Sequence, residues 1–248
     1  MEDCVNKLEQ ALGVKVVYSE KRFSRHNNVF FIEAVTASNV TQRYIIKEHV
    51  NSSTGNEVFI LNALNKQGIN VPDVIWHDNN IIIMPYIQGV LLGDLLIDIE
   101  IEEELWIGEL AKWLRKLHGY MNISSQVCLC MSNLNLRNFI FDGRKFYGLD
   151  FESVCFYPPE RDLGGICAFV LNNHPMFENW KYRICNSLIR AYEALLPGGG
   201  SMTKLDHDAI WFYLIEELKA AAGRRANQRH YLNAKIEELS YDKFFGND

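Results

Sequence analysis

The stretch MSNLNLRN at residues 131–138, followed by GLDFE at 148–152, decides the fold of this chain. Between them lie the apolar segment 139–141 and the dipeptide Asp142-Gly143, a strong signal for a tight hairpin turn. We therefore expect a short β-hairpin with Asn138 before its first strand and Asp150 after its second. An amide oxygen and a carboxylate are ligands that Mg²⁺ accepts in proteins. A turn-capping Asn and a strand-terminal Asp would be the plainer interpretation.

This ordered set resembles the catalytic and metal-binding loops of the aminoglycoside phosphotransferase and choline kinase family. That family usually carries His-x-Asp-x-x-x-x-Asn, and later a hydrophobic residue, Asp, Phe and Glu or a similar residue. Here Asn138 and Asp150 match, whereas Met131 replaces the His and Asn133 replaces the catalytic Asp. The resemblance covers most of residues 25–171 and is specific from 131 to 163. It implies a protein kinase-like fold, ATP and Mg²⁺ as cofactors, and Asn138 and Asp150 as metal ligands.

Two more residues match family positions. Asp162 corresponds to an acidic residue that braces the catalytic loop in the family, and His118 ends a predicted amphipathic helix at a position with a structural role. The resemblance therefore implies that Asp162 braces the catalytic loop and that His118 has a structural role.

The pattern along the chain predicts an α+β, bilobal layout. Residues 1–84 form the expected N-lobe, which is β-rich and binds nucleotide, and residues 85–248 form a mostly helical C-lobe. The N-lobe is predicted to contain a helix at 3–12, strands at 15–18, 29–35 and 43–47, a helix at 56–64, and a strand pair at 71–76 and 81–84. The C-lobe helices are predicted at 102–118, 162–171, 180–196, 206–223 and 229–239.

Lys47 ends a predicted strand, and Glu57 lies on the following helix. In a kinase such a lysine neutralises the α- and β-phosphates, and the glutamate fixes its position. In isolation the pair would be read as two solvated surface charges, because most such charges are exposed. Because the kinase-like motif at 131–152 follows in the same chain, we favour the interpretation as a phosphate-binding lysine and its glutamate partner.

The nucleotide would meet two further segments. The loop at 24–28 contains no glycine, so Ser24 and Asn27 are its candidate phosphate donors, although a plain polar turn fits equally well. The segment 84–89 reads as a hinge between lobes, with Met84 and Tyr86 contacting adenine.

Asn133 raises the question of activity, because an amide oxygen has no useful basicity near neutral pH. Loss of a general base typically costs ~10²–10⁴ in rate, whereas positioning and electrostatics dominate phosphoryl transfer. Three interpretations remain: a slow kinase, a nucleotide- or partner-binding pseudokinase, and a kinase whose base comes from elsewhere. Glu152 is the nearest unassigned acid in the sequence.

The composition is that of an ordinary globular protein. The net charge is −6 at pH 7, so no basic excess indicates nucleic acid. The six cysteines are scattered and read as reduced thiols, with Cys128 and Cys130 on a predicted strand in poor metal-site spacing. No apolar run is long enough to cross a membrane, and the N-terminus does not resemble a signal peptide.

We expect a cytoplasmic protein with ATP and a small-molecule acceptor as partners. The oligomeric state stays open.

The acceptor is the least determined feature. Acidic residues crowd positions 94–104, which would favour a cationic acceptor such as an amine. A solvated helix N-terminus explains them at least as well. Trp211-Phe212-Tyr213 with Glu216-Glu217 would suit an amine site, although helical spacing favours core packing for some of these rings.

Overall fold

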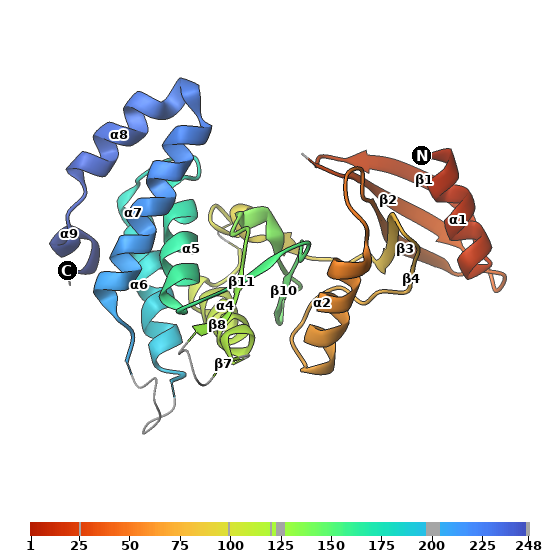
Figure 1. Ribbon diagram of the computed structural model, residues 1–248, viewed down its shortest axis with the longest axis horizontal. Helices are drawn as coiled ribbons and strands as arrows, with labels where there is room; N and C mark the ends of the chain where they lie inside the picture. The colour runs from red at the N-terminus through yellow and green to blue at the C-terminus, as the bar shows by residue number, and fades with distance from the viewer. Residues whose placement is uncertain (25, 99, 120, 123–126, 197–203, 247–248) are drawn as a thin grey trace. The chain divides into compact units, whose positions relative to one another are not determined.

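The computed structural model describes residues 1–24, 26–98, 100–119, 121–122, 127–196 and 204–246. Two compact units make up the chain: Met1–Gln88 with Gly148–Ser153, and Gly89–Tyr147 with Val154–Asp248. The N-terminal region is built on a β-sheet and the C-terminal region is mostly helical (Figure 1), so the predicted α+β class is confirmed. The boundary between the two lobes was predicted after residue 84. The units divide after Gln88, and six residues around Asp150 return to the first unit.

A five-stranded antiparallel sheet organises the first unit, in the order β1-β2-β3-β5-β4. Its strands are β1 (Lys15–Arg22), β2 (Asn28–Val35), β3 (Thr41–Glu48), β4 (Trp76–His77) and β5 (Ile81–Pro85). The helix α1 (Glu2–Leu12) precedes the sheet, and α2 (Gly55–Lys66) lies between β3 and β4. The runs of β-branched and aromatic residues that predicted β1, β2, β3 and β5 all form strands.

The two faces of this sheet differ because successive side chains of a strand point to opposite sides. One face packs against α1 and forms the core: Cys4, Leu8, Val14, Phe30, Ile32, Ala34, Tyr44, Ile46, Ile81 and Ile83. The alternate residues of β2, β3 and β5 lie on the other face. Lys47 follows Ile46 and therefore belongs to that second face.

The prediction of a strand at 71–76 is wrong for most of that segment. Only Trp76–His77 pairs with β5, although the amide of Ile75 also donates to Ile83 O at 2.9 Å. Pro72 lacks the N–H that a ladder requires, so it disfavours pairing here. The turn at 78–80 forms as predicted, because the Asp78 carboxylate accepts from the amides of Asn80 and Ile81.

The second unit begins with β6 (Val90–Leu91) and is dominated by helices. Its helices are α3 (Leu92–Leu95), α4 (Glu103–His118), α5 (Glu160–Asn172), α6 (Asn179–Glu193), α7 (His207–Arg224), α8 (Arg229–Glu238) and α9 (Tyr241–Phe245). The five longer helices match the predicted ones, whereas α3 and α9 are too short for periodicity to reveal. In Figure 1, α5, α6 and α7 run side by side.

Two small sheets carry the loop segment of this unit. The predicted hairpin consists of β9 (Phe139–Phe141) and β10 (Phe146–Gly148), and β9 also pairs with β6. The other sheet has the order β11-β8-β7, with β11 (Val154–Tyr157), β8 (Val127–Met131) and β7 (Met121–Asn122). The short 3-10 turn η1 (Leu136–Asn138) follows β8 and leads into the hairpin.

Gly89 has a packing reason that the sequence did not reveal. A Cβ there would lie 2.4 Å from Phe141 O and 2.6 Å from the Ile140 side chain. The residue is therefore glycine because β9 passes close by, and not because a hinge needs conformational freedom. Within the described part of the chain, the helices are too short or too polar to span a bilayer.

Candidate active site

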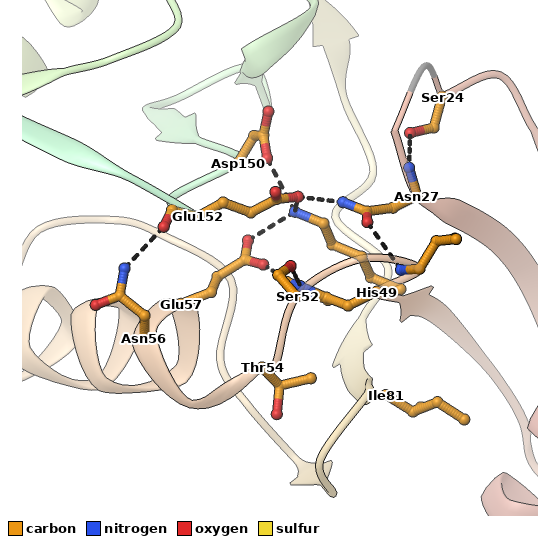
Figure 2. A network of polar contacts seen from close by, with 12 residues as sticks. Ser24, Asn27, His49, Ser52, Thr54, Asn56, Glu57, Ile81, Asp150 and Glu152 are labelled. Atoms are coloured by element: carbon orange, nitrogen blue, oxygen red, sulfur yellow. Dashed lines mark hydrogen bonds and ion pairs between the residues drawn. The ribbon is translucent and has the colours of Figure 1, made fainter.

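Lys47 is the centre of a partly buried ion-pair network in the first unit, and its partners Glu57, Asp150 and Glu152 are labelled in Figure 2. Its ammonium Nζ lies 2.9 Å from Glu57 Oε1, 2.9 Å from Asp150 Oδ1 and 2.8 Å from Glu152 Oε1. Lys47 is only 7% exposed, and Glu57 on α2 is 2% exposed. The predicted Lys47–Glu57 pair thus forms, and the alternative of two solvated surface charges is excluded.

The charges of this network do not balance. Three carboxylates surround one ammonium, and the ion pairs raise the Lys47 pKa well above its ordinary value although burial opposes this. Lys47 is therefore fully charged, yet it is one ammonium among three carboxylates. Such excess carboxylate charge suits a bound divalent cation, which prefers oxygen ligands.

Asp150 is held in an uncommon backbone conformation. Its φ of 65° lies in the left-handed region, which non-glycine residues seldom adopt outside turns and functional sites. The neighbouring Phe151 is 1% exposed and anchors the segment in the core. Asp150 Oδ1 binds Lys47, whereas Oδ2 has no hydrogen-bond partner among the described residues. One carboxylate oxygen is thus available to a metal or ligand.

Glu152 connects three segments of the first unit. Its carboxylate accepts from Asn27 Nδ2 and pairs with Lys47, and its backbone carbonyl accepts from Asn56 Nδ2 at 2.8 Å. Asn27 is 9% exposed. Its Oδ1 also accepts the Val50 backbone amide at 3.4 Å, and its backbone amide donates to Ser24 Oγ at 3.4 Å. The predicted phosphate loop is therefore tied to the lysine through Glu152. Arg25 of that loop lies outside the described residues.

His49 is a second partner of Glu57. Its Nε2 lies 2.8 Å from Glu57 Oε2, and its Nδ1 lies 2.9 Å from Ser52 Oγ. The ring is 4% exposed. Lys47 and His49 thus hold different oxygens of one carboxylate, which fixes the orientation of Glu57 from both sides.

The second face of the sheet offers an apolar surface beside Lys47. Phe31, Ile45 and Met84 are cross-strand neighbours, and the Phe31 ring lies 4.9 Å from the Tyr86 ring in an edge-on arrangement. Rings and aliphatic chains of this kind can form the wall of a nucleobase site. The Tyr86 amide donates to Arg43 O at 2.9 Å, so it is engaged within the protein.

The loop after β8 presents Asn133 and Asn138 in the second unit. Asn133 is exposed, and its Oδ1 accepts the Asn135 amide at 3.2 Å. Asn138 Nδ2 donates to Asn133 O at 3.1 Å. Asn138 Oδ1 has no hydrogen-bond partner among the described residues, so the atom that a cation would need is unengaged.

Asp162 holds the start of this loop in place through hydrogen bonds. Its Oδ2 accepts the Met131 amide at 3.0 Å and lies 3.2 Å from His118 Nε2, and all three residues are buried. Arg161 Nη1 donates to Met131 O at 2.7 Å and to Asp162 Oδ1 at 3.1 Å. The backbone of Met131 is thus fixed at both its N–H and its C=O, while its side chain is 1% exposed in the core.

Protonation strengthens this brace. Burial opposes the charge on His118, but hydrogen bonds with Asp162 and Cys130 and the charge of Asp162 raise its pKa to about 9. His118 is therefore an imidazolium at neutral pH. Cys128 and Cys130 lie close to His118, although their thiols contact backbone carbonyls of Tyr157 and Pro158.

Sequence reasoning missed His49 and Arg161 and left Glu152 unassigned. His49 lies two residues beyond Lys47, a spacing that points both side chains to one face of an extended segment. Arg161 directly precedes the brace residue Asp162. These spacings were visible, but only the fold gives each residue its partner.

Three comparisons place the chain among known proteins. A family model described as RIO domain matches residues 5–151, which is more than half of the chain. Among curated proteins, no sequence matches significantly.

Solved structures resemble the chain over nearly its whole length. ADP-bound aminoglycoside phosphotransferase APH(2'')-Ib has a TM-score of 0.63 at 14% identity, covering 98% of each chain. A choline/ethanolamine kinase family protein from Mesorhizobium loti has a TM-score of 0.60 at 14% identity, covering 99% of this chain and 95% of its own. An ethanolamine kinase from Plasmodium vivax has a TM-score of 0.55 at 14% identity, covering 100% of this chain and 81% of its own. At these identities the likeness establishes the kinase-like fold.

Proposed function

The chain belongs to the RIO-domain family, and from this premise we propose that it is an ATP-dependent phosphotransferase that moves the γ-phosphate of ATP to a hydroxyl of a small-molecule acceptor. Proteins of the same fold are described with ATP and streptomycin, or with ADP, bound to them. The observation that carries the proposal is the buried Lys47, whose ammonium contacts both Glu57 and Asp150.

Each nucleotide contact has a candidate residue. Lys47 would neutralise the α- and β-phosphates, with Glu57 fixing its position. Ser24 and Asn27 would line the phosphate loop, and Met84 and Tyr86 would contact the base. Mg²⁺, when bound, would neutralise phosphate charge during transfer, and Asn138 and Asp150 are the residues proposed to hold it.

The reaction leaves a defined task for Asn133. The acceptor oxygen forms a bond to the γ-phosphorus, the bond from that phosphorus to the bridging oxygen of ADP breaks, and the hydroxyl proton passes to solvent. Asn133 cannot take up that proton, but its amide can hydrogen-bond the hydroxyl and orient it. We therefore expect turnover slower than with a carboxylate by ~10²–10⁴.

Titration calorimetry with ATP, with and without Mg²⁺, tests the nucleotide site. We expect Mg²⁺-dependent binding that Asp150→Ala abolishes. Asp73→Ala, which removes an exposed acid of the same unit, should leave it unchanged. Absence of nucleotide binding by the unaltered protein would refute the proposal.

A second candidate function is a pseudokinase that binds nucleotide or a partner without turnover. The sequence feature that supports it is Asn133, which stands where the resemblance implies a catalytic Asp. Asn133→Asp distinguishes the two. Strong activity of this variant on an alcohol would mean that the remaining machinery is intact, whereas continued inactivity across a broad acceptor panel would favour the pseudokinase.

A further inference from the structure

Three aromatic rings and one guanidinium lie together beside the catalytic loop of the second unit. The Arg161 guanidinium lies 5.0 Å from the centre of the Tyr157 ring. The Tyr157 and Tyr213 ring centres are 6.5 Å apart, and those of Phe212 and Tyr213 are 5.3 Å apart. We call these four residues the Arg161 platform. Arg161 also donates a hydrogen bond to Met131 O. The Arg161 platform is therefore attached to the chain two residues before Asn133.

The fold builds this platform through a close helix crossing. A Cβ on Gly164 of α5 would lie 2.4 Å from Ile210 O and 3.0 Å from the Tyr213 Cβ, so α5 and α7 approach closely only because this residue is glycine. Gly164 lies one helical turn after Arg161. The close approach of α7 at Gly164 therefore brings Tyr213 beside Arg161. The strand β11, paired with β8, supplies Tyr157.

Two of the three rings of the platform are open to solvent, and Tyr213 is half-buried. Phe212 is 58% exposed and Tyr157 is 44% exposed, and Asn133 is also exposed. Scattered exposed rings need no explanation, but contiguous ones next to a reactive loop mark a ligand-binding surface.

Charged groups of both signs lie next to these rings, since Arg161 and Glu160 both act electrostatically on Tyr213. Glu160 is 6% exposed, and its carboxylate accepts the Asp206 amide at 3.0 Å. The single negative charge of Asp162 faces both Arg161 and the protonated His118. Arg161 uses Nη1 for the loop, and its Nε and Nη2 have no hydrogen-bond partner among the described residues. Its side chain is 23% exposed, so part of the guanidinium fork is free to bind an anion.

The acids on α7 that would suit a cationic acceptor are engaged, and the acidic segment 94–104 begins elsewhere. On α7, Glu216 pairs with Lys219 and Glu217 pairs with Arg224. The acidic segment 94–104 begins in α3, where Gly93 O accepts from Asn173 at the far end of α5. That end is ~18 Å along the helix from Arg161 at 1.5 Å per residue.

We propose that the Arg161 platform is the acceptor subsite, and that it binds a hydroxyl-bearing small molecule that carries an anionic group, a phosphate or a carboxylate. The free edge of the Arg161 fork holds the anion, because guanidinium geometry matches both oxoanions. The rings of Tyr157, Tyr213 and Phe212 cover the carbon skeleton. This inference rests on the proposed phosphotransferase function and names its substrate class.

A matched set of three-carbon alcohols tests the inference. Glycerol, glycerol 3-phosphate, glycerate and 2-amino-1,3-propanediol are titrated into the protein saturated with Mg²⁺-ADP, and each is then assayed for phosphorylation with Mg²⁺-ATP. We expect at least one anionic alcohol to bind at least 10-fold more tightly than the neutral and cationic ones. The phosphate and carboxylate members show which oxoanion is selected.

Substitutions separate anion binding from support of the loop. Arg161→Met should weaken binding of the preferred anionic alcohol at least 10-fold more than it weakens binding of glycerol, and the effect of Arg161→Lys should fall between those of Arg161→Met and the unaltered protein. Arg144→Met, at an exposed position in the hairpin, is the control and should have no effect. An equal loss for glycerol would mean that Arg161 only supports the loop, and this result would overturn the inference.

The two proposals fail in different ways. If nucleotide binds but neither anionic alcohol binds at millimolar concentration, or if the neutral or cationic alcohol is preferred, the platform assignment is wrong and the phosphotransferase proposal stands. If Mg²⁺-ATP and Mg²⁺-ADP do not bind at all, the proposed function itself is wrong.

Discussion

At the scale of single residues, the carboxylate of Glu57 is shared by two donors. A carboxylate only accepts hydrogen bonds, so the 2.8 Å contact requires a hydrogen on His49 Nε2. Glu57 is 2% exposed, and each of its two oxygens therefore depends on one protein donor. Loss of either donor leaves a buried carboxylate oxygen unsatisfied, which typically costs ~1–3 kcal/mol.

We predict that His49→Leu lowers the unfolding free energy by ~1–3 kcal/mol and weakens ATP binding, because Glu57 then turns away from Lys47. His49→Gln should recover most of both losses, since its amide can donate from nearly the same place as Nε2. Urea denaturation and calorimetry measure the two effects. If His49→Gln is as damaging as His49→Leu, the ring fills space and does not position Glu57.

His118 gives the fold a pH dependence with a defined sign. Its pKa is about 9 in the folded protein against an ordinary 6.5, so the folded state binds the proton more tightly. The resulting stability is fully present below pH 6.5 and is lost as the pH rises through 9. At ~1.4 kcal/mol per pKa unit, the effect is about 3 kcal/mol.

The measurement is the difference in unfolding free energy between the unaltered protein and His118→Gln, followed from pH 6 to pH 9.5. We expect this difference to shrink as the pH rises. Burial lowers the Lys181 pKa to about 8 and produces a trend of opposite sign, but Lys181 is present in both proteins and cancels. A difference that does not vary with pH would mean that His118 is not charged in the folded state.

At the scale of helices and strands, the packing of α5 on α7 depends on one missing methyl group. Gly164→Ala would place a Cβ 2.4 Å from Ile210 O, a backbone atom that can move only with its helix. We predict a loss of ~1–3 kcal/mol in unfolding free energy, as for other overpacked cores. Gly108→Ala in α4 is the matched control, because a Cβ there meets nothing within 4 Å. It should stabilise the protein by ~0.5–1 kcal/mol.

Chemical denaturation of both variants checks this prediction. Equal effects of the two substitutions would show that helix propensity, and not the crossing, decides the outcome at Gly164. The Arg161 platform provides a second readout. Because the crossing also places Tyr213 beside Arg161, Gly164→Ala should disturb acceptor binding whereas Gly108→Ala should not.

The elements that the sequence predicted are those set by local chemistry. The hairpin turn depends on Asp142, whose carboxylate accepts the amides of Arg144 and Lys145, and on Gly143 with its φ of 94°. The longer helices follow from apolar spacing. The extent of β4 and the glycine at position 89 depend on distant neighbours, and neither could be read from local pattern.

The same distinction holds for the candidate site. Lys47, Glu57 and Asp150 were predicted as candidates from the order of family motifs, and the structure brings these three together. Glu152 reaches Lys47 across more than a hundred residues, and nothing in its local sequence indicates that contact. Arg161 likewise looked like an ordinary residue at a helix start until the position of Met131 O was known.

At the scale of the whole molecule, the chain returns to the first unit only for Gly148–Ser153. That return supplies two of the three carboxylates around Lys47, Asp150 and Glu152. The ion-pair network around Lys47 is therefore complete only when chain segments from both halves of the sequence have folded. Without a cation, three carboxylates share one ammonium there, and their proximity opposes this folded state.

Mg²⁺-ATP should therefore stabilise the protein as a whole. A ligand that binds only the folded state at 100 times its Kd adds ~2.7 kcal/mol, and a chain of this size gains roughly 2–4 °C in melting temperature per kcal/mol. We predict a rise of ~5–10 °C with Mg²⁺-ATP, a much smaller rise with ATP and a chelator, and none for Asp150→Ala. Asn133→Asp should show the same rise as the unaltered protein, because Asn133 is assigned to the acceptor hydroxyl and not to the nucleotide. A thermal-shift series on the three proteins measures this. A full shift that persists in Asp150→Ala would place the metal and phosphates away from the Lys47 network.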